Sequence, residues 1–128
     1  MALRDTLSVM VVDDMSTSRG LIIMALEEMG VRKIDFRKSG GEALQALVAN
    51  PVHLVISDYN MPGLDGLGLL KGLRENRVTS RIGFILVSGR ITAEIIHMGQ
   101  ALGMNNYIQK PFSTPQLKSC LERVVGAL

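Results

Sequence analysis

Three aspartates, a serine and a lysine each stand at the end of a short, mainly apolar segment of this 128-residue sequence. They are Asp13, Asp14, Asp58, Ser88 and Lys110. Clustered carboxylates repel one another unless a cation lies among them, and Mg²⁺ prefers oxygen ligands of this kind. A hydroxyl and an ammonium group are donors suited to phosphoryl oxygens. If the five side chains converge, the sequence predicts a magnesium site beside a phosphoryl-binding site.

Asp58 ends the most informative segment. The run from Leu54 is typical of a strand buried on both faces, and a turn marked by Pro62 and Gly63 follows it. An acid at the carboxyl end of a buried strand lies where open α/β sheets bind ligands. Aspartate also commonly begins turns. From this segment alone the two interpretations are equally supported.

Strands and helices that alternate along the chain must position these groups. Apolar and β-branched segments predict strands over 8–12, 34–37, 54–58, 83–87 and 106–109. Apolar residues at helical spacing predict helices between Ser16 and Gly30, between Ser39 and Asn50, over 66–76, over 93–102, and from Thr114 onward. Ser16 and Thr114 are expected to cap their helices, and Leu21 and Met98 to face the core.

This alternation predicts one α/β domain over residues 1–128, with a flavodoxin-like (βα)5 doubly wound parallel sheet in strand order 2-1-3-4-5. In that order the carboxyl ends of strands one, three, four and five share one rim. The acids, Ser88 and Lys110 would then meet. Lys110 alone could form a structural ion pair there, but one amine cannot balance three acids, so a metal ion explains the cluster better.

Composition excludes several classes of function. Hydrophobic residues make up 47% and charged residues 20%, which indicates a globular domain. A net charge of +2 without a block of like charges, together with 4% aromatic residues, disfavours binding to DNA or other nucleic acid. No apolar run approaches the ~20 residues of a membrane span, and no signal peptide is evident, so we expect a cytoplasmic protein without membrane insertion. A single cysteine, Cys120, allows no internal disulfide and is expected in the core.

Three other classes of site fit the sequence less well. A phosphatase of the dehalogenase type needs a second acid two residues after the nucleophile, where this chain has Asn60. A dinucleotide-binding loop needs Gly-x-Gly-x-x-Gly directly after a strand, whereas Gly66, Gly68 and Gly72 have another spacing and fall in a predicted helix. An apolar flavin site would not need the acid cluster with Lys110.

The motifs Asp13-Asp14, Asp58, Ser88-Gly89 and Lys110-Pro111-Phe112 resemble those of receiver domains of two-component response regulators. The resemblance covers essentially the whole chain, and the stretch from Asp58 to Leu67 is very specific. Single-domain chemotaxis regulators of the CheY type look most similar, because they share Asn60-Met61-Pro62 and a tyrosine at the position of Tyr107.

The resemblance implies a role for each site residue. Asp58 would be the phospho-acceptor, and Mg²⁺ would be held by Asp13, Asp14, Asp58 and the backbone carbonyl of Asn60. Ser88 and Lys110 would bind the phosphoryl oxygens, and the Tyr107 ring would change its exposure as Ser88 moves. Asn60 and Arg90 would tune the lifetime of the phosphate, and the Lys110–Pro111 peptide bond would be cis.

The resemblance also implies a function. The chain would accept a phosphoryl group from a histidine kinase and signal through contact with another protein, such as a flagellar switch component in chemotaxis. It would not be a conventional enzyme, although Mg²⁺-dependent self-phosphorylation and autodephosphorylation are implied. The alternative is a phosphorelay or phosphate-sink receiver, or a receiver cut from a longer regulator.

Overall fold

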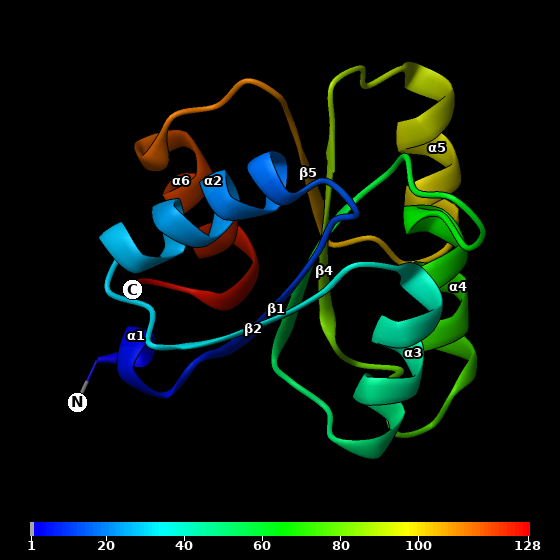
Figure 1. Cartoon of the computed structure of the whole chain (residues 1–128), viewed down its shortest axis with the longest axis horizontal. Coiled ribbons are helices and arrows are strands. Elements are labelled where there is room, and N and C mark those ends of the chain that lie inside the picture. The colour runs from blue at the N-terminus through cyan, green and yellow to red at the C-terminus, as the bar shows by residue number, and fades with distance from the viewer. Residues whose placement is uncertain (1) are drawn as a thin grey trace.

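Five short segments form one parallel sheet in the computed structural model, which describes residues 2–128 (Figure 1). The strands are β1 (Ser8–Val12), β2 (Lys33–Arg37), β3 (Leu54–Asp58), β4 (Gly83–Ser88) and β5 (Asn106–Gln109). The helices are α1 (Leu3–Thr6), α2 (Ser16–Glu28), α3 (Gly40–Ala49), α4 (Gly66–Glu75), α5 (Ala93–Ala101) and α6 (Thr114–Val125). The strand order β2-β1-β3-β4-β5 confirms the predicted topology.

The sheet separates two hydrophobic cores. In Figure 1, α2 and α6 lie on one side of the sheet and α3, α4 and α5 on the other. Alternate residues of a strand point to opposite faces, so Val9 and Val11 enter the first core while Met10 and Val12 enter the second. The central strands β1, β3 and β4 are almost entirely buried, as their apolar sequences predict.

Two predicted helix caps are wrong by one residue. Ser16 is the first residue of α2, and the N-cap is Met15, whose amide donates instead to Asp13 Oδ1 at 3.0 Å. Ser113, not Thr114, caps α6 through a reciprocal capping box with Gln116. The errors are of one residue only, because adjacent residues compete for the same capping position.

Two predicted core residues lie on the surface. Leu21 is 60% exposed and Met98 is 43% exposed. The buried stripe of α2 is narrower than the apolar pattern, and Gly99 is the buried residue of α5. The helix α1 was not predicted, because four residues are too few to show a helical period.

The start of α4 lies very close to the end of β3. The amide of Gly66 donates to the Tyr59 carbonyl at 2.9 Å. A Cβ atom at Gly66 would overlap with the carbonyl oxygen of Asp58 and lie 2.8 Å from Leu86 Cδ1. Glycine at this position is therefore a packing requirement, which its place in a predicted helix did not indicate.

Replacing Gly66 with Ala should lower the free energy of unfolding by about 2 kcal/mol, because the added methyl group meets backbone that cannot move freely. The matched control is Gly20→Ala in α2, where a Cβ meets nothing within 4 Å. That change should raise the free energy of unfolding by about 0.5–1 kcal/mol. Urea denaturation of both variants measures the difference, and equal effects would contradict the close approach.

Arg74 of α4 fastens the loop that joins α5 to β5. Its Nη2 donates to the Gly103 carbonyl at 2.9 Å and to Asn105 Oδ1 at 3.1 Å. Its Nη1 donates to the Ser80 carbonyl at 3.1 Å. The same Asn105 Oδ1 accepts from the Phe84 amide at 2.8 Å, so α4, β4 and this loop form one hydrogen-bonded junction at the amino end of the sheet.

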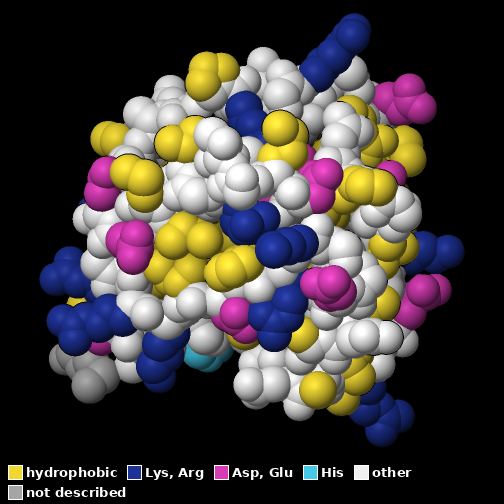
Figure 2. All heavy atoms as spheres, viewed as in Figure 1, with side chains coloured by type: hydrophobic (Ala, Val, Ile, Leu, Met, Phe, Trp, Pro, Cys, Tyr) yellow, Lys and Arg dark blue, Asp and Glu magenta, His cyan; other side chains and the backbone are white. Residues whose placement is uncertain are grey.

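One face of the molecule carries a group of exposed hydrophobic side chains near α2 and the edge strand β2 (Figure 2). Phe36 of β2 has an exposed ring, and the Arg19 guanidinium of α2 lies over it, 4.7 Å from its centre. Cys120 is buried as predicted, and burial raises the pKa of its thiol to about 11. Within residues 2–128, no helix combines the length and the apolar character that crossing a membrane requires.

Candidate functional site

The carboxyl rim of the sheet gathers the predicted residues from four strands. Asp13 follows β1, Asp58 ends β3, Ser88 ends β4 and Lys110 follows β5. Strand register fixes their relation, since Asp58 pairs with Val87 and Ser88 pairs with Gln109. The Lys110 amide also donates to the Ser88 carbonyl at 2.8 Å. Residues that are up to about a hundred positions apart therefore meet because the strand order is 2-1-3-4-5.

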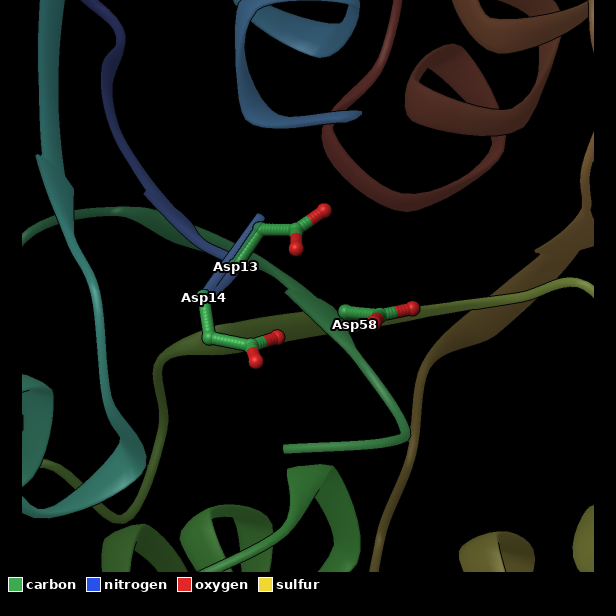
Figure 3. Close-up of side chains that lie close together, drawn as sticks. All are labelled: Asp13, Asp14 and Asp58. Atoms are coloured by element: carbon green, nitrogen blue, oxygen red, sulfur yellow. The ribbon is translucent and has the colours of Figure 1, made fainter. Parts of the chain in front are cut away.

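Three carboxylates converge at this rim. Asp13, Asp14 and Asp58 each offer an oxygen, and these oxygens lie within 4.8 Å of one another (Figure 3). Asp13 is 0% exposed and Asp58 is 7% exposed, whereas Asp14 is open to solvent. Two buried acids with an exposed third make a pocket that a cation can enter from solvent.

Lys110 supplies the positive charge of the pocket. Its Nζ lies 3.2 Å from Asp58 Oδ1 and 3.6 Å from Asp13 Oδ2. It also donates a short hydrogen bond of 2.6 Å to the hydroxyl of Ser18. The Lys110–Pro111 peptide bond is cis, as the family resemblance implied.

The buried acid Asp13 is held from two sides and leaves one oxygen free. Its Oδ1 accepts from the Met15 amide at 3.0 Å, and its backbone carbonyl accepts from Arg19 Nη1 at 3.0 Å. Among residues 2–128, Asp13 Oδ2 is the one buried side-chain polar atom without a hydrogen-bond partner. A buried, unpartnered carboxylate oxygen next to two further carboxylates fits a hard divalent cation such as Mg²⁺.

Asp58 titrates in a mixed environment. Burial raises the pKa of this carboxyl above its ordinary value of 3.8 and outweighs the opposing effect of the Lys110 ammonium. The neighbouring charge of Asp13 adds to the rise in the pKa. The acid cluster is thus poorly compensated by protein charges alone.

Ser88 is placed at the rim, but its hydroxyl is engaged elsewhere. The side chain is buried, and Oγ donates to the Arg90 carbonyl at 3.0 Å and accepts from the Arg90 amide at 3.2 Å. No hydrogen bond joins Ser88 Oγ to a carboxylate within the described chain. Contact between this hydroxyl and a group on Asp58 would require Ser88 to exchange its Arg90 partners.

The other predicted residues surround the pocket. Asn60 and Arg90 are exposed in the loops that follow β3 and β4. Tyr107 lies on β5 with 38% of its surface exposed, and it lines a cavity of about 420 Å³ between β5 and α6. The structure therefore places Asn60 and Arg90, the predicted tuning residues, beside the rim. Tyr107, the predicted switch residue, lies near the start of β5, away from the rim.

Two residues of the site were not found from the sequence. Ser18 contacts Lys110, and Arg19 holds the backbone of Asp13. Both belong to the first turns of α2, directly after the acid pair. The only signal that could have indicated them is this position, because the first turn of a helix that follows a strand faces the same rim.

Comparison with known proteins identifies the pattern. The family model for the response regulator receiver domain matches residues 9–122. A probable chemotaxis protein CheY from Rhizobium etli is 36% identical over 128 residues, covering 100% of this chain and 99% of the relative. The chemotaxis protein CheY-3 from Vibrio cholerae is 30% identical over 126 residues, covering 98% and 97%.

Solved structures agree in fold. The chemotaxis protein CheY4 of Vibrio cholerae superimposes with a TM-score of 0.86 at 26% identity, covering 92% of this chain and 98% of that one. The receiver domain of a sensor histidine kinase from Pseudomonas aeruginosa superimposes with a TM-score of 0.84 at 22% identity, covering 94% and 98%. That structure has a magnesium ion coordinated in its active-site cleft.

Proposed function

Because this chain belongs to the response regulator receiver family, we propose that it receives a phosphoryl group on Asp58 from a histidine kinase and then signals by binding another protein. The observation that carries the proposal is the position of Asp58, which ends β3 beside two further acids and 3.2 Å from the Lys110 ammonium. The proposal treats residues 1–128 as one receiver domain, since one sheet spans the chain from β1 to β5.

In the transfer step, a carboxylate oxygen of Asp58 forms a bond to phosphorus while the bond from phosphorus to the donor imidazole nitrogen breaks. The imidazole leaves and takes up a proton, and an aspartyl phosphate remains. The attacking carboxylate must be ionised, and the Lys110 ammonium favours that form against the effect of burial. Lys110 also faces the negative charge that the transferred group brings.

We propose that Asp13, Asp14, Asp58 and the backbone carbonyl of Asn60 hold Mg²⁺ in this pocket. The unpartnered Asp13 Oδ2 supports that assignment, and the three carboxylate groups supply the oxygen ligands that Mg²⁺ prefers. When bound, the ion neutralises charge on the phosphoryl oxygens. Asp13 and Asp58 are oriented for this role by Met15, Arg19 and Lys110.

Signalling requires that the new phosphate alters a surface. We propose that Ser88 gives up its hydrogen bonds to Arg90 and that its hydroxyl then donates a hydrogen bond to a phosphoryl oxygen. The exposed ring of Tyr107 then turns inward, and the surface of α5, β5 and α6 changes. Both arrangements belong to one equilibrium that phosphorylation shifts. Asn60 and Arg90, at the mouth of the pocket, would set how quickly water removes the phosphate.

The similarity to chemotaxis proteins suggests the target. We propose that the phosphorylated chain binds a component of a flagellar switch. A relay or sink receiver would instead pass its phosphate to a histidine-containing protein without gaining affinity for such a component. The two functions therefore differ in which partner responds to phosphorylation.

The proposed function is tested by incubating the chain with radiolabelled acetyl phosphate, with Mg²⁺ or with excess EDTA. We expect label that depends on Mg²⁺ and is lost in alkali, as for an acyl phosphate. The beryllofluoride-treated chain should then bind a switch-component peptide more tightly than the untreated chain. Absence of label would contradict the acceptor role, and label without a gain in peptide affinity would indicate the relay or sink function.

A further inference from the structure

Ser18 joins the first turn of α2 to the lysine that closes the acidic pocket. The residue is half-buried, and its Oγ accepts a hydrogen bond of 2.6 Å from the Lys110 ammonium. This is the shortest contact made by Nζ, which lies 3.2 Å from Asp58 and 3.6 Å from Asp13. Ser18 therefore engages one N–H donor of the ammonium, and Asp58 forms the closer of its two ion pairs.

The ammonium also lies near a second carboxylate oxygen that it does not reach. A charge-assisted N–H···O hydrogen bond ordinarily has a length of about 2.7–2.9 Å. The Nζ of Lys110 stands 3.6 Å from Asp13 Oδ2, although that oxygen is buried and has no other partner within residues 2–128. Coulomb attraction alone would draw the ammonium closer, so another contact must hold it back.

We propose that Ser18 is a positioning residue that holds the Lys110 ammonium away from Asp13 and so keeps Asp13 Oδ2 accessible to Mg²⁺. The inference rests on the proposed function, because the proposed function assigns Asp13 to Mg²⁺ and Lys110 to Asp58 within one site. Asp13 then serves the cation, while Lys110 serves the acceptor Asp58 and the group transferred to it.

Removing the Ser18 hydroxyl frees one N–H of the ammonium. Lys110 then closes on Asp13 Oδ2 and occupies the oxygen that Mg²⁺ needs. In Ser18→Ala we expect the dissociation constant for Mg²⁺ to rise by about three- to tenfold, at or below the range known for residues that orient metal ligands. Ser18→Thr keeps the hydroxyl and should bind Mg²⁺ within about twofold of the unaltered chain.

The matched control is Thr17→Ala. Thr17 precedes Ser18 in α2 and lines a surface groove together with Ser18 and Lys110, but it is exposed. Its removal should leave the dissociation constant for Mg²⁺ unchanged. Magnesium titrations are followed by the amide signals of the 15N-labelled chain, which also report whether each variant keeps its fold.

A double-mutant cycle separates positioning from a merely structural role. If Ser18 acts through the ammonium, Ser18→Ala should have no effect on Mg²⁺ affinity once Lys110 has been replaced with Ala. An equal loss of affinity with and without the lysine would overturn the inference. An unchanged affinity in the single variant Ser18→Ala would overturn it as well.

The same titration distinguishes the inference from the function beneath it. If the unaltered chain binds Mg²⁺ and accepts phosphate while Ser18→Ala behaves identically, only the role of Ser18 is overturned. If the unaltered chain binds no Mg²⁺, the proposed metal site and this inference are overturned together. Weaker binding in Ser18→Ala, rescue in Ser18→Thr and no effect in the Lys110→Ala background would support it.

Discussion

Replacing Asp58 with Asn should abolish incorporation of phosphate from acetyl phosphate. The amide that replaces the carboxylate is a poor nucleophile and cannot form the acyl phosphate. The change removes one oxygen and adds a nitrogen of similar size at a buried position, so the fold should survive. Radiolabel retained after gel filtration measures the effect, and Glu94→Gln, an exposed acid in the first turn of α5, is the matched control. Label in Asp58→Asn equal to that in the control would remove Asp58 from its role.

The same variant should be more stable than the unaltered chain at neutral pH in EDTA. A carboxyl whose folded pKa is raised favours the neutral form in the fold. Its stabilising contribution is fully present below the ordinary pKa of 3.8 and is lost as the pH rises through the folded value. Asn resembles the neutral acid, so the gain in the free energy of unfolding should be present at pH 7 and vanish below about pH 3.8. A gain that does not depend on pH would contradict the role of charge.

Replacing Asp13 with Asn should slow phosphorylation by about 100-fold or more at millimolar Mg²⁺. The expectation follows from the loss of a buried charged ligand, since weakened metal affinity and weakened charge neutralisation act together. Initial rates of labelling over a Mg²⁺ titration measure the effect. Asp35→Asn, at an exposed carboxylate on β2 that pairs with Arg37, is the control and should retain the full rate.

The Asp13→Asn variant should gain stability while it loses function. In the absence of Mg²⁺, Asp13 contributes a buried charge that raises the pKa of Asp58 and repels it. Removing that charge should raise the free energy of unfolding, because the repulsion acting on Asp58 is lost. Urea denaturation in EDTA tests this expectation. A loss of stability would indicate that the Lys110 attraction outweighs the repulsion between the two acids.

The fold was predictable because each strand and helix carries its own signal. Apolar segments alternate with helical periods, and this alternation leaves few possible topologies. Once the strand order is known, Asp13, Asp58 and Lys110 must share a rim. The likeness to receiver domains then supplied roles for these residues that spacing alone did not.

Other features depend on distances that sequence patterns do not encode. Helical periodicity places Leu21 on the apolar side of α2 but does not say how wide the buried stripe is. The bond between Ser18 and Lys110 joins residues 92 positions apart, so no local pattern announces it. The hydrogen bonds between Ser88 and Arg90 likewise cannot be predicted from the sequence, because a serine at a strand end is compatible with several hydrogen-bond partners.

The junction around Arg74 has a mechanical consequence for α5. It ties the loop after α5 to α4 and β4 at the amino end of the sheet, whereas the acidic pocket lies at the carboxyl end. The other end of α5 is capped by Thr92, close in sequence to the end of β4, where Ser88 bonds to Arg90. We therefore expect α5 to pivot about its carboxyl end near Gly103. A small displacement at the pocket would then tilt the helix and move its first turn the most.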